Sequence, residues 1–485
     1  MQDTQQVEVN GGQIHLDIIL KRNITHSRCE LEAGTHARHH VRQGACLHHL
    51  RRLGLIPSTS LDWPAGDTSR VPFAIYTNEQ IHRKELQRFF YRGHWCYVGL
   101  EAEVPRPGDF KRTVVGERSV ILSRAADGQL HCFENVCAHR GMQFCRKRHG
   151  SGMKEFVCPY HQWSYTLSGE LQGVPLRRGV RQDGRVLGGM PADFDTKAHG
   201  LTRLKVATRG GVVFASFDHD VEPLEDYLGP TILPYFDRLF NGRQLKILGY
   251  NRQRIPGNWK LMQENIKDPY HPGLLHTWFV TFGLWRADNK AALRMDAHHR
   301  HAAMISTRGN AGKQSDVSQV SSFKAAMELE DKRFLDIVHE DWWGEPTVVM
   351  TTVFPSVIFQ QQVNSVSTRH IQPDGHGHFD FVWTHFGFAD DTAEMTARRL
   401  RQANLFGPAG FVSADDGEAI ELSQCGFTQK PGHHALVEMG GRGVEETDYM
   451  ATETLIRGMY DYWRKVMERP DQASDAVAPQ EGAQA

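Results

Sequence analysis

The sequence lacks any long hydrophobic run. No apolar stretch approaches the ~20 residues that a helix needs to cross a bilayer, and the N-terminus has no apolar core of the kind that signal peptides carry. Cysteine is also scarce, with 8 residues scattered through a chain of 485. This usage argues against a disulfide framework, so we expect a cytoplasmic protein whose thiols are free to bind metal.

Net charge is nearly absent as well. The chain has 56 Lys and Arg against 57 Asp and Glu, a formal charge of −1, which leaves no electrostatic footprint for nucleic acid or an anionic membrane. No glycine-rich dinucleotide-binding motif follows a predicted strand. Hydrophobic residues at 40% and charged residues at 23% are typical of a globular protein. The function must therefore be sought in local motifs.

The pattern of residues along the chain predicts an α+β fold in several parts. The parts are an N-terminal extension (1–66), a helix that joins the larger domain (67–95), a small antiparallel β domain (96–215), a larger domain with a central antiparallel sheet flanked by helices (216–467) and a polar, disordered tail (468–485). The extension holds seven histidines within its first 49 residues, but no ligand spacing recurs, so we interpret it as weakly structured. The helix before the β domain is expected to have Thr77 or Asn78 as its cap.

Two short loops inside the β domain each offer one thiol and one imidazole. They are Cys137-x-His139 in "CAHRG" and Cys158-x-x-His161 in "CPYHQWSY". Zinc could take two thiolates and two imidazoles, but zinc fingers place their histidines on a helix, and here turn residues surround the ligands. One Cys and one His from each loop suit a binuclear iron cluster, with both cysteines on one iron and both histidines on the other. The pattern resembles the Rieske two-iron two-sulfur signature.

Neutral imidazoles in place of two thiolates make an added electron easier to accept, so the cluster would be a one-electron carrier of moderate potential. Cys145 fits neither loop, and we interpret it as a packed bystander thiol. The neighbouring run of Arg146, Lys147 and Arg148 is expected to be a solvated loop, with a docking patch for an acidic electron donor as the alternative.

A second candidate metal set follows in "NWKLMQENIKDPYHPGLLHTWF". Asp268 and His271 are three residues apart, so a helix would place them on one face. His271 and His276 are five apart, about 140° around an ideal helix, which is poor for a shared ligand. Pro272 and Gly273 between them could distort the helix and bring the second imidazole round. The alternative is two unrelated histidines beside a helix break.

A carboxylate could complete this set. The stretch "GFVSADDGEAIELSQ" offers Asp415 and Asp416 ahead of a helical pattern. Two histidines and one carboxylate form the facial triad of non-haem iron oxygenases, which leaves positions open for dioxygen and for water. One carboxylate leaves Fe(II) with a net positive charge.

Together the two sets resemble the catalytic large (α) subunit of Rieske non-haem iron ring-hydroxylating oxygenases, over roughly residues 67–467. The resemblance implies that His271, His276 and Asp416 hold a mononuclear Fe(II), with Asp415 the less favoured carboxylate. It implies a Rieske 2Fe-2S cluster on Cys137, His139, Cys158 and His161. It also implies that Asp268 carries electrons by bridging His271 to His161 of a neighbouring subunit.

The same resemblance implies the co-substrate and partners. Dioxygen would be the co-substrate, and electrons would pass from NADH through a reductase and a ferredoxin, since the chain has no NADH-binding motif of its own. The family assembles as trimers of α subunits, often with small β subunits, so an α3 or α3β3 oligomer is expected.

Several blocks, among them "RSVI", "ENVCAHRGM" and "FGPAGFVSADDGE", are most similar to the salicylate 5-hydroxylase branch of this family. That similarity implies an aromatic carboxylic acid substrate and monohydroxylation of salicylate to gentisate. The alternative is a ring-dihydroxylating dioxygenase for a benzoate- or anthranilate-like acid, because the metal ligands are shared.

Two other classes would also contain some of these motifs. An electron-transfer Rieske protein would lack the third iron, and a structural zinc protein would lack iron altogether. A central strand over 357–370 is also expected to present Gln360, Gln362 and Asn364 on one side. A satisfied hydrogen-bond network is the simpler interpretation, with a bound carboxylate or phenol as the alternative.

Overall fold

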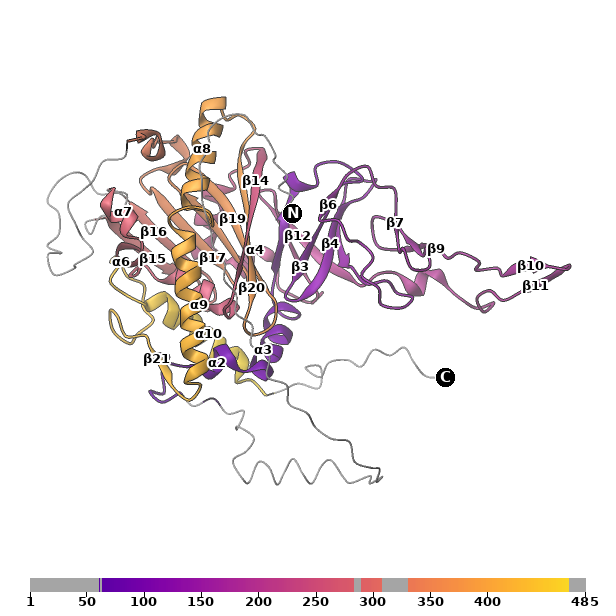
Figure 1. Cartoon of the computed structure of the whole chain (residues 1–485), viewed down its shortest axis with the longest axis horizontal. Coiled ribbons are helices and arrows are strands. Elements are labelled where there is room, and N and C mark those ends of the chain that lie inside the picture. The colour runs from indigo at the N-terminus through magenta and orange to yellow at the C-terminus, as the bar shows by residue number, and fades with distance from the viewer. Residues whose placement is uncertain (1–60, 62, 283–288, 308–329, 471–485) are drawn as a thin grey trace, which may run out of the picture. The chain divides into compact units, whose positions relative to one another are not determined.

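The computed structural model describes residue 61 and residues 63–282, 289–307 and 330–470 (Figure 1). The predicted extension and tail therefore lie almost entirely outside the described residues. In the described part, two seven-stranded sheets and three smaller ones are built from antiparallel pairs. The predicted α+β class, with a small β domain and a larger sheet flanked by helices, is confirmed.

The first sheet is formed by short strands from the N-terminal half of the described chain. In spatial order its strands are β2 (Cys96–Leu100), β13 (Val212–Ser216), β12 (Arg203–Arg209), β5 (Leu130–Glu134), β4 (Arg118–Arg124), β3 (Phe110–Val115) and β6 (His149–Gly150). A three-stranded sheet of β7 (Phe156–Val157), β8 (Ser164–Tyr165) and β9 (Leu171–Gly173) lies next in the chain, followed by the hairpin β10 (Val180–Gln182) and β11 (Arg185–Leu187). Both candidate cluster loops come from this part.

The second sheet has longer strands from the C-terminal half. In spatial order they are β14 (Leu245–Ile255), β20 (Phe379–Phe388), β19 (Ser365–Pro373), β18 (Val357–Gln362), β17 (Val348–Val353), β16 (Ala302–Thr307) and β15 (Lys290–Met295). The single strand predicted over 357–370 is wrong. The chain turns back at Val363 and Asn364, where Val363 adopts a positive φ of 46°, and β18 pairs with β19 as a hairpin.

Side chains alternate across the second sheet, so its two faces have different neighbours. On one face the Thr368 hydroxyl lies 2.9 Å from the hydroxyl of Tyr97 in β2, which joins the two large sheets. Helix α4 (Leu224–Leu239), which kinks at Gly229, packs Ile232 against the same face. The opposite face carries Ser367 and Arg369 on β19 and supports the candidate iron site.

Helices cover that opposite face and its edges (Figure 1). They are α5 (Trp259–Lys267), α6 (Pro272–Leu275), α7 (Thr277–Thr281), α8 (Ala393–Phe406), α9 (Ser413–Gln429) and α10 (Thr454–Met467). The amphipathic helix predicted near the C-terminal end is confirmed as α10, which buries Tyr460 and Trp463 in the main core. Its Trp463 indole donates to the buried Glu85 carboxylate at 2.7 Å.

The N-terminal helix begins where the sequence predicts and ends early. Strand β1 (Arg70–Pro72) pairs with β21 (His434–Leu436), and the one-turn helix α2 (Ala74–Thr77) precedes α3 (Glu79–Glu85). Asn78 caps α3, because its side chain accepts from the backbone N–H groups of Gln80 and Ile81. A π-helical turn, Leu86–Phe90, ends the helical stretch before the first sheet starts.

Candidate metal centres

Helix α5 sets the position of the first candidate iron ligand. The Asn258 side chain caps its start by accepting from the Lys260 N–H, and the helix ends at Asp268. Pro269 follows, and a residue before proline avoids helical backbone angles, so Asp268 adopts φ −98° and ψ 96°. The prediction that Asp268 and His271 share one face of a continuous helix is therefore wrong.

The break still brings the two side chains together. Asp268 Oδ1 accepts from the backbone N–H of Tyr270 at 2.8 Å and of His271 at 3.3 Å. Asp268 Oδ2 lies 3.4 Å from Nδ1 of the His271 imidazole. A carboxylate at Nδ1 favours the tautomer with the proton there, which leaves Nε2 free as a metal ligand.

A new short helix then turns the chain so that the second imidazole converges on the first. Pro272 occupies the first position of α6, His271 stands at its N-terminal cap and His276 at its C-terminal cap. The two imidazole rings lie 5.3 Å apart between centroids, at an angle of 74°. The imidazoles converge as the sequence allowed, but through the end of α5 at Asp268 and a new helical turn from Pro272, and not through a distortion within one helix.

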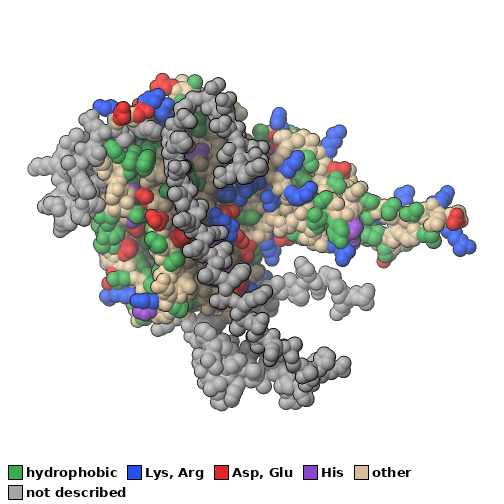
Figure 2. Space-filling view, in the orientation of Figure 1, with side chains coloured by type: hydrophobic (Ala, Val, Ile, Leu, Met, Phe, Trp, Pro, Cys, Tyr) green, Lys and Arg blue, Asp and Glu red, His purple; other side chains and the backbone are tan. Residues whose placement is uncertain are grey.

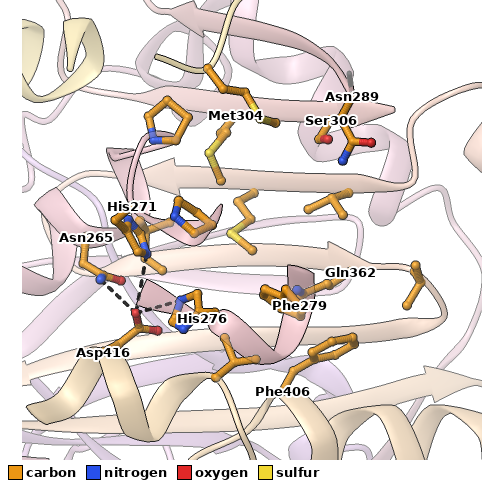
Figure 3. A pocket seen from close by; sticks show the side chains of 18 of the residues that line it. Asn265, His271, His276, Phe279, Asn289, Met304, Ser306, Gln362, Phe406 and Asp416 are labelled. Atoms are coloured by element: carbon orange, nitrogen blue, oxygen red, sulfur yellow. Dashed lines mark hydrogen bonds and ion pairs between the residues drawn. The ribbon is translucent and has the colours of Figure 1, made fainter. Parts of the chain in front are cut away.

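Helix α9 supplies the carboxylate. Asp416 lies in the first turn and is buried, with Oδ1 3.2 Å from Nε2 of His276 and 3.5 Å from Nε2 of His271. One ligand atom from each of these three residues lies within 4.8 Å of the others. Asn265, which sequence reasoning missed, donates to the same Oδ1 at 3.0 Å, so Asp416 makes three contacts (Figure 3).

The two neighbouring aspartates have different positions. Asp415 is partly exposed, and its Oδ2 lies 3.2 Å from Nδ1 of His276, on the side of the ring away from Asp416. This contact fixes the His276 tautomer as Asp268 fixes that of His271. Each imidazole therefore contacts one carboxylate at Nδ1, and both imidazoles face Asp416 through Nε2.

The electrostatics of the set favour a positive charge at its centre. Burial disfavours a charged imidazole, but the carboxylates of Asp268 and Asp416, which accept hydrogen bonds from the ring, outweigh it and raise the pKa of His271 to about 10. Burial likewise opposes ionisation of Asp416, yet the two imidazoles hold the pKa of its carboxyl well below the usual range. Two imidazoles and one carboxylate facing a shared point are the donor set that suits Fe(II), so the residues fit a mononuclear iron.

The candidate cluster site is built from two tight turns. The Gly141 N–H bonds to the Cys137 carbonyl at 2.9 Å in the first turn, and the Gln162 N–H bonds to the Cys158 carbonyl at 2.8 Å in the second. Gly141 and Gln162 both adopt positive φ, 71° and 59°, at the ends of these turns. Each turn thereby directs a cysteine inward and a histidine outward.

The four predicted cluster residues meet between these turns. Cys137 and Cys158 are buried, and burial raises the pKa of the Cys158 thiol. The rings of His139 and His161 lie at the rim, 4.5 Å apart. Two thiols on the inner side and two imidazoles on the outer side match the ligand arrangement of a Rieske cluster, so the donors fit that group.

Further residues support the cluster site. The Tyr165 hydroxyl lies 3.2 Å from the Cys137 sulfur and accepts from the Ala138 N–H at 3.0 Å. Trp163 stacks on the His139 ring at 4.6 Å, with only 4° between the planes. Cys145 lies in the same core cluster, its Sγ donating to the Lys147 carbonyl at 3.5 Å.

A cavity of about 100 Å³ opens beside the candidate iron site. Its walls are largely apolar, and Figure 3 shows Phe279 and Phe406 on the side of His276 and Asp416, with Met304 and Ser306 across from them. Gln362 and Arg369 add polar groups from the second sheet. The sequence pattern predicted Gln362 as an inward-facing polar residue, but gave no sign of Arg369.

Two family models match separate parts of the chain. The Rieske [2Fe-2S] domain family matches residues 94–183, and the catalytic domain of the ring-hydroxylating alpha subunits matches residues 239–469. The large oxygenase component of salicylate 5-hydroxylase from Ralstonia sp. is 73% identical over 406 residues, which cover 84% of this chain and 96% of that protein. The large subunit of anthranilate 1,2-dioxygenase from Burkholderia cepacia is 41% identical over the same shares of both chains.

A solved structure shows the same fold at lower identity. Naphthalene 1,2-dioxygenase from Rhodococcus sp., bound to indole, superposes with a TM-score of 0.68 at 23% identity, over 83% of this chain and 95% of that one. No helix in the described residues is both long and apolar enough to cross a membrane.

Membership of this family fixes the cofactors and the broad activity. A [2Fe-2S] cluster and a mononuclear iron belong to one chain of a multicomponent oxygenase, which works as an oligomer and receives electrons from NADH through reductase and ferredoxin partners. The chain belongs to the large, or alpha, subunits of the Rieske-type aromatic ring-hydroxylating oxygenases.

Proposed function

We propose that this chain is the catalytic subunit of an oxygenase that hydroxylates an aromatic carboxylic acid, with the conversion of salicylate to gentisate as its reaction. The observation that carries the proposal is the 73% identity, across nearly the whole of the relative, to a salicylate 5-hydroxylase large component. Relatives at 41% and 39% identity are named for anthranilate and terephthalate, which are also aromatic acids.

The size of the cavity supports a small substrate. An apolar cavity of about 150 Å³ is known to hold one benzene molecule, and the cavity beside His271, His276 and Asp416 measures about 100 Å³. Phe279 and Phe406 line it with apolar surface that a single aromatic ring could contact. A single-ring acid suits this volume better than a fused or biaryl substrate.

Two groups of side chains that converge in the structure are assigned as metal ligands. We assign the mononuclear iron to His271, His276 and Asp416. The Rieske cluster is assigned to four residues, Cys137, His139, Cys158 and His161. When bound, the mononuclear iron supplies the site at which dioxygen is activated for transfer of one oxygen atom to the ring. The chain's own residues hold that site, with Asn265 fixing Asp416 and two further carboxylates orienting the imidazoles.

Asp268 is proposed to link the two centres between subunits. Its side chain is about one-fifth exposed while it contacts His271, so a neighbouring chain could reach it. His139 is exposed at the cluster site, and the largely exposed Tyr160 lies 3.8 Å from the His161 ring. Both ends of the bridge thus lie near the surface, which supports an α3 or α3β3 assembly in which His161 of one subunit meets Asp268 of the next.

The electron donor is proposed to dock beside the cluster. Five exposed basic side chains follow or flank the ligand loops: Arg140, Arg146, Lys147, Arg148 and Lys154. Figure 2 shows Lys and Arg side chains on the surface of this part of the molecule. An acidic ferredoxin would be steered to such a surface. The thiol ligands and the need for NADH suit the cytoplasm, where we place the enzyme.

Product analysis tests the reaction. The purified chain, with any small subunit, would be supplied with ferredoxin, reductase, NADH and ¹⁸O₂, and given salicylate, anthranilate or benzoate. We expect gentisate carrying one labelled oxygen atom from salicylate, the second atom leaving as water. A dihydroxylated product from anthranilate or benzoate, with no gentisate, would establish the dioxygenase alternative that the 41% identity to an anthranilate dioxygenase keeps open.

A further inference from the structure

Arg369 is a buried cation on the wall of the cavity. It lies on β19, on the face of the second sheet that points toward the iron site, and lines the same cavity as His271, His276 and Asp416. Only 3% of the residue is exposed. Charged side chains this deeply buried are normally paired, because removing a charge from water is costly.

Within the described residues, Arg369 has no such partner. Its Nε lacks a hydrogen bond, and no carboxylate there lies within ion-pair distance of the guanidinium. Asp416 is near enough to favour the charge, but the Asp416 carboxylate is already engaged by the two imidazoles. Burial lowers the pKa of Arg369 to about 9, so the guanidinium remains charged at neutral pH.

An aromatic ring holds the guanidinium in place instead. Arg369 stacks on Trp383 with 3.9 Å between the guanidinium carbon and the ring centroid. The two residues are direct cross-strand partners on β19 and β20. A stacked guanidinium is fixed in orientation while its N–H groups stay available for an incoming ligand.

Other unpartnered polar atoms lie around it on the same sheet face. They are Gln360 Oε1, Ser367 Oγ, Trp383 Nε1 and His385 Nδ1. Strand pairing places them together, because Ser367 pairs with Gln360 on one side and with His385 on the other. Buried polar atoms rarely stay unpaired in native proteins, so these atoms next to Arg369 leave hydrogen-bonding capacity for water or another polar group behind the cavity wall.

We infer that Arg369 binds the carboxylate of the substrate and so sets both its selection and its orientation in the cavity. The inference deepens the proposed function and rests on an aromatic acid being the substrate. A guanidinium can donate two parallel N–H bonds to a carboxylate, a geometry that a neutral amide or a phenol cannot match. The apolar ring then extends from Arg369 across the cavity toward His271, His276 and Asp416.

Ligand discrimination tests this assignment more directly than turnover does. Salicylate and salicylamide have nearly the same shape, but only salicylate carries the negative charge. Binding of each radiolabelled compound to the iron-loaded oligomer would be measured by equilibrium dialysis, for the native chain and for Arg369→Gln. We expect the substitution to weaken salicylate binding by about 30-fold or more, with salicylamide changed by less than about threefold.

Arg238→Gln provides a matched control. Arg238 also lies over a tryptophan, Trp342, and burial lowers its pKa to about 10. Its donors, however, are satisfied by the backbone carbonyls of Trp343 and Pro346, and the residue does not line the cavity. Arg238→Gln should leave the ratio of the two affinities unchanged. Equal losses for both ligands in Arg369→Gln, or no loss for salicylate, would overturn the inference.

Two further measurements keep the test decisive if Arg369→Gln does not assemble. Arg369→Lys keeps a charge but loses the planar fork, and should show a smaller loss confined to salicylate. The native chain alone should bind salicylate at least about 30-fold more tightly than salicylamide, and equal affinities would refute the carboxylate contact. Gentisate formation by the native chain is scored separately, so a failure of the Arg369 assignment is distinguishable from a failure of the proposed reaction.

Discussion

Replacing Asp415 should weaken iron binding without abolishing it. Asp415 Oδ2 lies 3.2 Å from Nδ1 of His276, whereas Asp416 faces Nε2 of both imidazoles. In Asp415→Ala the His276 ring loses the acceptor that fixes its tautomer, but the three atoms that face the metal remain. Asp416→Ala removes one of those atoms.

The size of the effect follows from the exposure of the contact. Loss of a group that orients a metal-bound histidine typically costs 10- to 100-fold in metal affinity. The Asp415 side chain is 41% exposed, so solvent screens its charge although His276 is buried. We therefore expect the lower part of that range, about 10- to 30-fold, or roughly 1.4 to 2 kcal/mol.

Competition with a chelator measures this directly. Fe(II) would be titrated into each variant against a coloured chelator, with the visible absorption of the Rieske cluster reporting the amount of intact protein. Asp415→Ala should retain a third iron at a raised dissociation constant, and Asp416→Ala should retain only the two cluster irons. Glu418→Ala removes an exposed carboxylate from the same helix and should bind iron as the native chain does.

Two results would refute the reasoning. If Asp415→Ala bound iron as tightly as the native chain, the contact with His276 would have no orienting role. If Asp415→Ala lost the third iron while Asp416→Ala kept it, the two aspartates would have been assigned in reverse.

Three further predictions concern electron transfer, potential and pH. Asp268→Ala should keep both metal centres and a reducible cluster. After rapid mixing of the reduced protein with substrate and oxygen, its cluster should be oxidised much more slowly than that of the native chain. Oxidation at the native rate would exclude the bridging role. Tyr165→Phe removes the hydroxyl 3.2 Å from the Cys137 sulfur, so the cluster potential should fall by about 20 to 60 mV in a spectroscopic redox titration, and an unchanged potential would contradict this. Burial raises the pKa of Glu264 from 4.5 to about 7, so its contribution to stability is present below pH 4.5 and is lost, by about 3 kcal/mol, as pH rises through 7. Melting curves of Glu264→Gln should therefore fall less between pH 5 and 8 than those of the native chain, and parallel curves would contradict the assignment.

The sequence could predict a metal site where ligand-type residues that are rare in proteins stand close together in the chain. A Cys-x-His and a Cys-x-x-His in one β domain have few other uses, and both pairs come together as expected around Cys137 and Cys158. The convergence of His271 and His276 could be predicted only as one of two alternatives, because it depends on the backbone conformation that the chain adopts where prolines interrupt the helix. The structure resolves it as two helices instead of one distorted helix.

Contacts between distant segments could not be predicted. Asn265 reaches Asp416 across 151 positions, and nothing in the spacing of either residue signals the pair. The role of Arg369 depends on the register of β18, β19 and β20, and the sequence pattern predicted one strand where a hairpin forms. Residues 357–370 contain no glycine or proline to mark the turn at Val363 and Asn364, so the sequence pattern gave little sign of it.

The charges around the cavity also bear on which aromatic compounds the site accepts. The three carboxylates of Asp416, Asp268 and Asp415 together outweigh the charge of one Fe(II), so an anionic substrate gains from a further cation near the site. Arg369 lies on the wall of the same cavity, where its guanidinium offsets part of the negative charge of the carboxylates. A neutral ring would gain the same apolar contacts but would leave the guanidinium buried and unpaired. The neutral compound would therefore bind with lower affinity than the acid. Selection for acids over hydrocarbons would then have two sources. One is the hydrogen bonding of Arg369 to the carboxylate, and the other is the free-energy penalty of leaving Arg369 unpaired beside a hydrocarbon.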